Sequence, residues 1–410
     1  MNEQNEIQVD QNNMYFYQGT EELFLKNKLD DNNKKLSFLK QKITDFLNIK
    51  NIHFLFGAGV SSKSIPTMKQ FVSLIIKKIK QEDEKLKFLK LFAKLLKYQK
   101  SNLEDILGVL YSKREYQKGI KEEDLDTEKL IKIIESTIFE GINVDISDNS
   151  HENTIKLYET FYQRTAYRSK DFSRINIFTT NNDLFNERVL DRLNINFNNG
   201  FGGGLDKYFN PARFSYTFSK KIEASIEKYE PLDNMVYLYK LHGSINWIEE
   251  EGNSLFNIKE INIDKDYKPD SKNVLIYPNP LKQGKSLTAP YSDIIREFQR
   301  KLLLQNSVLF VIGYSFSDDH LNNIIYQALS SNSSLSIVIF GNYPSKSIFK
   351  INDKRIYKIN GQDAQDNKIH YFEYIVNELI PNLNEDKSEE ILKNFVNTLN
   401  IERRREETQS

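Results

Sequence analysis

Asn181, Asp183 and His242 are polar side chains at positions suited to chemistry, because each follows directly on an apolar run that predicts a strand. Asn181 and Asp183 come after Ile175–Phe178, and His242 comes after Met235–Leu241. In an open α/β sheet the carboxyl ends of parallel strands meet at one edge, where ligands bind. We therefore expect an amide, a carboxylate and an imidazole to converge there and to form a polar site.

A glycine turn predicts what this edge would bind. The apolar run Ile52–Phe56 stops at Gly57-Ala58-Gly59, and a helical pattern resumes at Met68. A strand, a glycine turn and a helix can hold a phosphate, because the backbone approaches the ligand closely and the helix N-terminus presents unpaired N–H groups. Gly-x-Gly alone also occurs for purely conformational reasons.

Each of these motifs also has a plainer structural interpretation. Asn181-Asn182-Asp183 after a strand is typical of a turn or a helix cap. His242 before Gly243 would suit a buried, hydrogen-bonded histidine. Asp318-Asp319-His320, which follows the apolar run Ser307–Ile312 and Gly313, would suit the capped start of a helix.

Alternating strand and helix patterns organise the rest of the chain. Strand patterns at 52–56, 175–178, 235–241, 307–312 and 335–340 are separated by helical periodicity, and the last of them ends near Phe340. This predicts an α/β fold: a Rossmann-like, mostly parallel sheet with an inserted helical subdomain and helical N- and C-terminal extensions. The expected divisions are a helical N-terminal extension at 1–50, a nucleotide-binding domain at 51–372 with inserted helices at 67–170, and a helical, charged tail at 373–410. Residues 1 to about 13 are expected to be disordered, and Ser101-Asn-Leu-Glu104 to form a capping box.

Composition excludes several classes of protein. The 410 residues contain 57 basic and 57 acidic side chains, so a basic footprint for nucleic acid is absent from the whole chain. A lysine-rich stretch from Lys77 to Lys100 is interleaved with acids and is typical of a solvated helix face. The chain has no cysteine, which excludes disulfides and cysteine-based zinc sites and fits a cytoplasmic protein. No apolar run approaches the roughly 20 residues that span a bilayer.

Other catalytic motifs fail on their spacing. Gly284-Lys285-Ser286 lacks the earlier glycine of a P-loop, because that position is Asn279. Gly313-Tyr-Ser-Phe-Ser317 ends in serine where a nucleophile elbow needs glycine. The histidines are scattered, and none forms a metalloprotease pair, so no metal site is expected.

Four stretches resemble, in order, the motifs of the sirtuin family. Gly57-Ala-Gly-Val-Ser61 with Ile65-Pro66 is similar to the sirtuin signature loop, and Thr179-Thr-Asn-Asn-Asp183 to its Thr-Gln-Asn-Ile-Asp motif. His242-Gly243 is similar to the catalytic His-Gly, and Gly313–His320 resembles the matching stretch of the bacterial sirtuin-like branch of anti-phage defence. The resemblance covers roughly residues 50 to 345.

This resemblance implies an NAD site and assigns roles to its residues. It implies that Asn181 orients the nicotinamide ribose and a water, that Asp183 holds the nicotinamide carboxamide, and that His242 acts as general base at the ribose hydroxyls. The remaining cofactor-binding residues implied by the resemblance are Gly57, Ala58, Gly59 and Ser61 at the pyrophosphate and ribose, and Gly313 and Ser315 at the adenosine.

Two departures from the family bear on the reaction. A deacylase sirtuin continues Asp-Phe-Arg where this chain has Thr67-Met68-Lys69, and it carries a four-cysteine zinc module, which is absent here. Water is therefore the expected acceptor, no zinc is expected, and the implied activity is an NAD glycohydrolase that depletes NAD during phage infection.

The alternatives are a zinc-free deacylase or ADP-ribosyltransferase, and a non-catalytic NAD-binding scaffold. A homo-oligomer and a hexameric HerA-type ATPase are the expected partners, with no membrane and no nucleic-acid partner. The sequence leaves open the activating trigger, the stoichiometry and the phage specificity.

Overall fold

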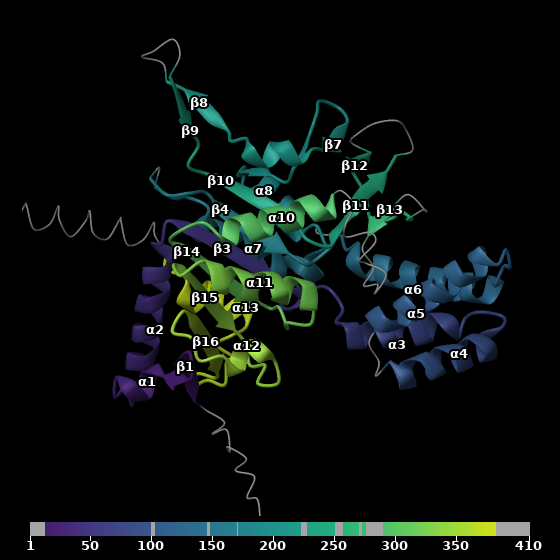
Figure 1. Ribbon diagram of the computed structural model, residues 1–410, viewed down its shortest axis with the longest axis horizontal. Helices are drawn as coiled ribbons and strands as arrows, with labels where there is room; N and C mark the ends of the chain where they lie inside the picture. The colour runs from purple at the N-terminus through teal and green to yellow at the C-terminus, as the bar shows by residue number, and fades with distance from the viewer. Residues whose placement is uncertain are drawn as a thin grey trace, which may run out of the picture.

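The computed structural model describes residues 13–99, 103–145, 148–169, 171–222, 228–250, 257–269, 273–275 and 290–382. Within these residues the largest sheet has nine strands in the order β2-β1-β16-β15-β14-β3-β4-β10-β5 (Figure 1). Its strands are β1 (Met14–Gln18), β2 (Glu21–Glu22), β3 (Asn51–Phe56), β4 (Ile175–Thr179), β5 (Asn196–Asn198), β10 (Met235–Lys240), β14 (Ser307–Ile312), β15 (Leu335–Phe340) and β16 (Ile356–Gly361). Every pairing from β16 to β5 is parallel, so the predicted mostly parallel α/β sheet is confirmed.

Helices cover both faces of this sheet, which is why its central strands are apolar without alternation. Along β3, Phe54 and Phe56 face the core shared with α2 and α7, whereas Leu55 faces the core shared with α10 and α11. The helices that accompany the sheet are α1 (Leu23–Lys26), α2 (Asn32–Leu47), α7 (Glu152–Thr165), α8 (Phe185–Arg192), α10 (Tyr291–Leu302), α11 (Asp319–Ser331), α12 (Ser347–Lys350) and α13 (Phe372–Tyr374).

Four helices between β3 and β4 pack around a core of their own. They are α3 (Met68–Ile79), α4 (Lys85–Tyr98), α5 (Leu103–Gly119) and α6 (Leu125–Ile142). Phe71, Phe88 and Ile134 are buried in this core. In Figure 1 these helices stand to one side of the sheet, whereas α7 returns to pack on it.

A second, antiparallel sheet combines two strands that precede the His-Gly turn with three that follow it, and the sequence patterns did not predict it. Its strands, in the order β13-β11-β12-β7-β6, are β13 (Asn273–Leu275), β11 (Gly243–Glu249), β12 (Ile258–Glu260), β7 (Lys207–Phe209) and β6 (Phe201–Gly202). A further hairpin joins β8 (Ser219–Lys221) and β9 (Tyr229–Pro231). Most of these strands have only two or three residues, too few for a period to be visible.

The two ends of the chain correct two predictions. The N-terminal extension is not wholly helical, because β1 pairs antiparallel with β16 at the sheet edge. The strand pattern does not end near Phe340 either, since β16 adds a further parallel strand. The helical part of this extension includes α2, which has Asp31 as its N-cap.

Some predicted features lie outside the described residues. They are the first twelve residues, Ser101 of the expected capping box, the rejected P-loop stretch at 279–286 and the tail beyond residue 382.

Near the end of the described residues, α13 continues into one π-helical turn, η4 (Ile375–Leu379). In the part of the chain that is described, no helix has the length and apolarity to cross a membrane.

Candidate active site

Four turns lie side by side because the strands before them end in register. Phe56 of β3 is opposite Thr179 of β4 and Ile312 of β14, and Thr179 is opposite Lys240 of β10. The segments that follow these residues carry the glycine turn, Asn181 and Asp183, His242, and Gly313–Asp318. The structure therefore brings the sequence-selected residues to one edge of the sheet.

The glycines after β3 and β14 are required by contact between two turns. A Cβ on Gly57 would lie 2.5 Å from the carbonyl oxygen of Gly313, and one on Gly59 would lie 2.6 Å from the Cα of Gly313. Gly313 itself has φ +67°, a conformation that favours glycine. The amide of Gly59 donates to the carbonyl of Gly313 at 3.0 Å. These contacts account for the glycines by backbone packing, and Ala58 and Gly59 are the exposed part of the turn.

The helix expected to follow the glycine turn begins later than phosphate binding would need. Only one 3₁₀ turn, η1 (Ala58–Val60), follows Gly57. The long helix α3 starts at Met68, as its periodicity predicted, and its N-terminus is closed by a capping box between Thr67 and Gln70. Thr67 and Met68 serve as the exposed start of this helix.

Asn181 belongs to a buried polar chain with Ser61 and Tyr158. The amide Nδ2 of Asn181 donates to the Ser61 hydroxyl at 3.3 Å, and that hydroxyl lies 2.9 Å from the Tyr158 hydroxyl. Burial, with the nearby Asp183 carboxylate, raises the pKa of Tyr158 well above its ordinary value, so its hydroxyl keeps its proton. Tyr158 lies in the middle of α7, among residues with ordinary helical periodicity. Nothing in the sequence therefore distinguished it as a residue of the site.

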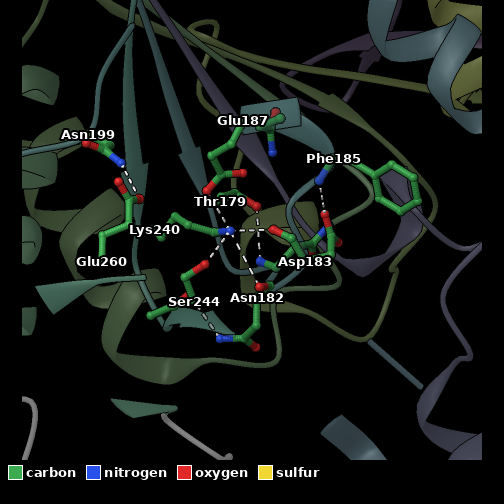
Figure 2. Close-up of polar contacts among 12 residues, drawn as sticks. Thr179, Asn182, Asp183, Phe185, Glu187, Asn199, Lys240, Ser244 and Glu260 are labelled. Atoms are coloured by element: carbon green, nitrogen blue, oxygen red, sulfur yellow. Dashed lines mark hydrogen bonds and ion pairs between the residues drawn. The ribbon is translucent and has the colours of Figure 1, made fainter. Parts of the chain in front are cut away.

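Asp183 is buried and already has a structural role. Its Oδ1 accepts a hydrogen bond from the amide of Phe185 at 3.1 Å, at the start of α8 (Figure 2). This is the turn that the plainer interpretation predicted, whereas the N-cap of α8 is Leu184 and has no side-chain cap bond. Burial raises the pKa of Asp183, and the Lys240 ammonium and the Phe185 amide oppose that rise. The carboxylate therefore depends on a nearby positive charge.

His242 has a carboxylate partner. Its Nε2 lies 3.0 Å from Oδ2 of Asp318. Oδ1 of Asp318 accepts from the amides of His320 and Leu321, which makes Asp318 the N-cap of α11. The helix cap predicted from sequence is confirmed, but the same residue also orients the imidazole. An ionised carboxylate only accepts, so it favours the tautomer with the proton on Nε2 and the basic lone pair on Nδ1.

Ser315 lies at the exposed rim of the edge. Its hydroxyl donates to Ser317 at 3.2 Å, and both side chains are exposed. The structure does not bring Ser315 into contact with Asn181 or His242 through any interaction described.

Sequence reasoning missed four residues that hold this edge together: Tyr158, Asn182, Lys240 and Asp318 in its second role. For Lys240 a signal existed, because a lysine ends the otherwise uncharged run Met235–Tyr239. Asn182 lies within the motif, between Asn181 and Asp183, but it was not assigned a role. Across the described ranges no group of three or more histidine, aspartate or glutamate side chains could hold a metal ion.

Comparison with known proteins gives one family match. Residues 175–360 match the model of a family described as the SIR2-like domain. No curated protein matches the chain.

The chain is also distantly similar to solved structures. One is described as the crystal structure of a Sir2 homologue–NAD complex (13% identity, TM-score 0.37, covering 83% of this chain and 92% of that chain). Another is a mutant Sir2 homologue with ADP-ribose (14% identity, TM-score 0.37, 85% and 97% covered). Likenesses this distant say nothing about the activity of this chain. The stretch that is similar to the SIR2-like domain, residues 175–360, includes the turns after β4, β10 and β14.

Proposed function

We propose that this protein cleaves NAD⁺ to nicotinamide and ADP-ribose. The observation that carries the proposal is the in-register ending of β14, β3, β4 and β10, which gathers Asn181 and the His242–Asp318 pair at one edge. Two further observations support it. Three of the four turns lie in the stretch that is similar to the SIR2-like domain, and the four motifs resemble those of the sirtuin family.

The proposed reaction breaks the bond between the ribose and the nicotinamide nitrogen. The bonding electrons leave with nicotinamide, which departs neutral, and the ribose passes through an oxocarbenium-like state that water attacks. Asn181 would orient the ribose and the water, and Ser61 would fix the Asn181 amide. His242 would accept a proton at Nδ1, with the imidazolium stabilised by Asp318. Such a step depends on orientation and preplaced charge more than on a strong nucleophile.

Water is the acceptor we favour over an acyl-lysine or a protein side chain. Thr67, Met68 and Lys69 replace the Asp-Phe-Arg of deacylases, and here Thr67 and Met68 begin α3. The chain also contains no cysteine for a zinc module. The alternatives, deacylation, ADP-ribosyl transfer and NAD binding without turnover, are outcomes of the test below.

The biological role follows from the resemblance alone. We propose that NAD depletion by this cytoplasmic enzyme is the effector step of an anti-phage abortive-infection system. Activation would come through self-assembly into a homo-oligomer or through a partner such as a HerA-type hexameric ATPase. A pull-down from phage-infected cells, compared with uninfected cells, tests this part separately from the chemistry.

The deciding experiment measures nicotinamide release from NAD⁺ by the wild type and by His242→Ala, with and without an acetyl-lysine peptide. Lysate from phage-infected cells is added in a parallel series to supply an activator. We expect release without peptide, and we expect it to be lost in the variant. Release only with peptide would show a deacylase, and NAD⁺ binding without release in either series would show a scaffold.

A further inference from the structure

A buried lysine lies beneath the candidate site. Lys240 ends β10 and is only 1% exposed. Its Nζ donates to the backbone carbonyl of Asp183, reaches the carbonyl of Asn182 at 3.5 Å, and donates to the Ser244 hydroxyl at 3.0 Å (Figure 2). All of these acceptors lie in the two segments that carry Asn181 and His242.

Asn182 makes the reverse connection. Its Nδ2 donates to the carbonyl of His242 at 2.7 Å and to that of Gly243 at 3.1 Å. Lys240, from the β10 side, thus holds carbonyls of the β4 turn, and Asn182, from the β4 turn, holds carbonyls of the β10 turn. Two backbone bonds run alongside, from the amide of Leu241 to Thr179 at 2.8 Å and from that of Ile245 to Asn182 at 3.1 Å.

The charge of Lys240 is balanced within the same cluster. Its Nζ forms an ion pair with Glu187 of α8 at 2.8 Å, and both side chains are buried. Burial raises the pKa of Glu187 and of Asp183, and in each case the Lys240 charge opposes that rise. A buried ion pair is weak evidence for a stabilising role, because desolvation offsets most of its attraction.

Stability alone does not explain where the lysine points. A leucine or methionine would fill the end of an apolar strand without desolvating a charge. Lys240 instead distributes its protons among carbonyl groups of the turn that carries Asn181. The carbonyl of Asp183 accepts from Lys240, and the carbonyl of Asn182 accepts from the Ile245 amide as well.

We propose that Lys240 and Asn182 are positioning residues that lock the turns after β4 and β10 to each other, and so fix the separation of Asn181 and His242. This inference rests on the proposed function only for its kinetic consequence. The locking of the two turns is a property of the protein without substrate.

The test compares Lys240→Met, Lys240→Met/Glu187→Gln and Asn182→Ala with the wild type. If the lysine positions the turns, kcat for nicotinamide release falls about 100-fold in both Lys240 variants, as a misplacement of about 1 Å would cause, while KM changes little. The double variant removes both charges of the Lys240–Glu187 pair but leaves Asp183 without the Lys240 charge, so its Tm should recover partly toward the wild type while its kcat stays low. Asn182→Ala should lower kcat in the same sense.

Two matched controls lie elsewhere in the fold. Lys358 is a buried lysine on β16 whose Nζ donates to the carbonyl of Phe349 at 2.9 Å. Asn332 bridges the carbonyls of Leu302 and Leu304, each at 2.8 Å. Lys358→Met and Asn332→Ala should lower Tm and leave kcat unchanged.

Amide hydrogen exchange supplies a readout that needs no activity. Exchange at residues 180–185 and 241–245 should accelerate together in Lys240→Met, in its double variant and in Asn182→Ala, and not in the controls. Unchanged exchange, or a double variant that recovers kcat along with Tm, would overturn the proposal. A wild type without NAD⁺ turnover would refute the proposed function, and the exchange data alone would then decide the positioning role.

Discussion

The edge of the sheet that carries the candidate site and the core of helices α3–α6 are filled by different side chains. At the edge, Asp183, Glu187 and Lys240 are buried together. In the described part of α3–α6, the buried side chains are apolar except for Thr127 and Thr137. Ion pairs of these helices, such as Lys78–Glu140, stay at the surface.

The contrast separates stability from function. Apolar burial stabilises a core by about 25 cal/mol for each Å² removed from water. Buried polar groups gain little net stability and lose much when one partner is removed. The polar cluster buried at the ends of β4 and β10 therefore points to a role in geometry, and the helical core to a role in packing.

The largest expected effect on activity is at Asn181. Asn181→Ala should lower nicotinamide release about 1,000-fold, the loss typical of a preorganised polar group at a reacting centre. Its one described side-chain hydrogen bond is the 3.3 Å contact to Ser61, so the free energy of unfolding should fall by at most about 1 kcal/mol. Initial rates and thermal denaturation of the same preparation measure both quantities.

Phe88→Ala in the core of α3–α6 is the complementary control, because it should change stability and not turnover. Phe88 has no exposed surface, and its truncation should cost about 3–5 kcal/mol of stability. The folded fraction should keep its turnover rate. A large stability loss in Asn181→Ala would instead make that residue a turn-forming part of the fold.

Two capping aspartates give the next comparison. Asp318→Asn keeps an acceptor for the amides of His320 and Leu321 but replaces the carboxylate oxygen beside His242. An amide there can donate to Nε2 and favour the wrong tautomer, so turnover should fall about 100-fold, with little change in Tm. The pH profile of kcat should also change.

Asp124→Asn is the control for this variant. Asp124 caps α6 by accepting from the amide of Thr127 at 3.1 Å, far from the strand-end site. It should leave turnover unchanged. Equal rates for Asp318→Asn and the wild type would refute a catalytic use of the His242–Asp318 pair.

The smallest expected effect is on the free energy of unfolding at acidic pH, and it comes from a residue of the large sheet. His53 of β3 is fully buried, and burial, with the charges of Lys301 and Arg168, lowers its pKa to about 3. Between pH 6.5 and pH 5.5 the unfolded chain takes up a proton that the folded chain does not, so this residue should lower the free energy of unfolding by about 1 kcal/mol. His53→Phe should abolish that part of the slope.

Urea denaturation at several pH values measures the difference. The same slope in His53→Phe would show that this histidine is not responsible.

Much of the parallel sheet was predictable, because each strand buried on both faces is a largely apolar run. The strands β3, β4, β10, β14 and β15 were all located to within a residue or two. That the residues after these strands would lie at one edge was also predictable, because the carboxyl ends of neighbouring parallel strands lie at the same edge of the sheet. The antiparallel sheet around β11 was not predictable, because its short strands pair through long-range contacts that leave no local period.

The residues that follow the strands could be selected from the sequence, but the contacts that join their turns could not. Asn181, Asp183 and His242 stand at strand ends, where residue type and position are informative. The contacts of Asn182 with His242 and of Lys240 with Asp183 join turns about 60 residues apart. Only the register of β4 against β10 creates them, and register is a tertiary property.

We expect NAD⁺ to bind at the four strand ends and not on the helices beside them. Hydrogen–deuterium exchange of the whole protein, with and without saturating NAD⁺ or ADP-ribose, measures where the ligand lies. Binding at the strand ends should protect residues 57–61, 180–183, 241–244 and 313–318, with no change in the described part of 68–142. Protection confined to 68–142, or none anywhere, would refute this position of the site.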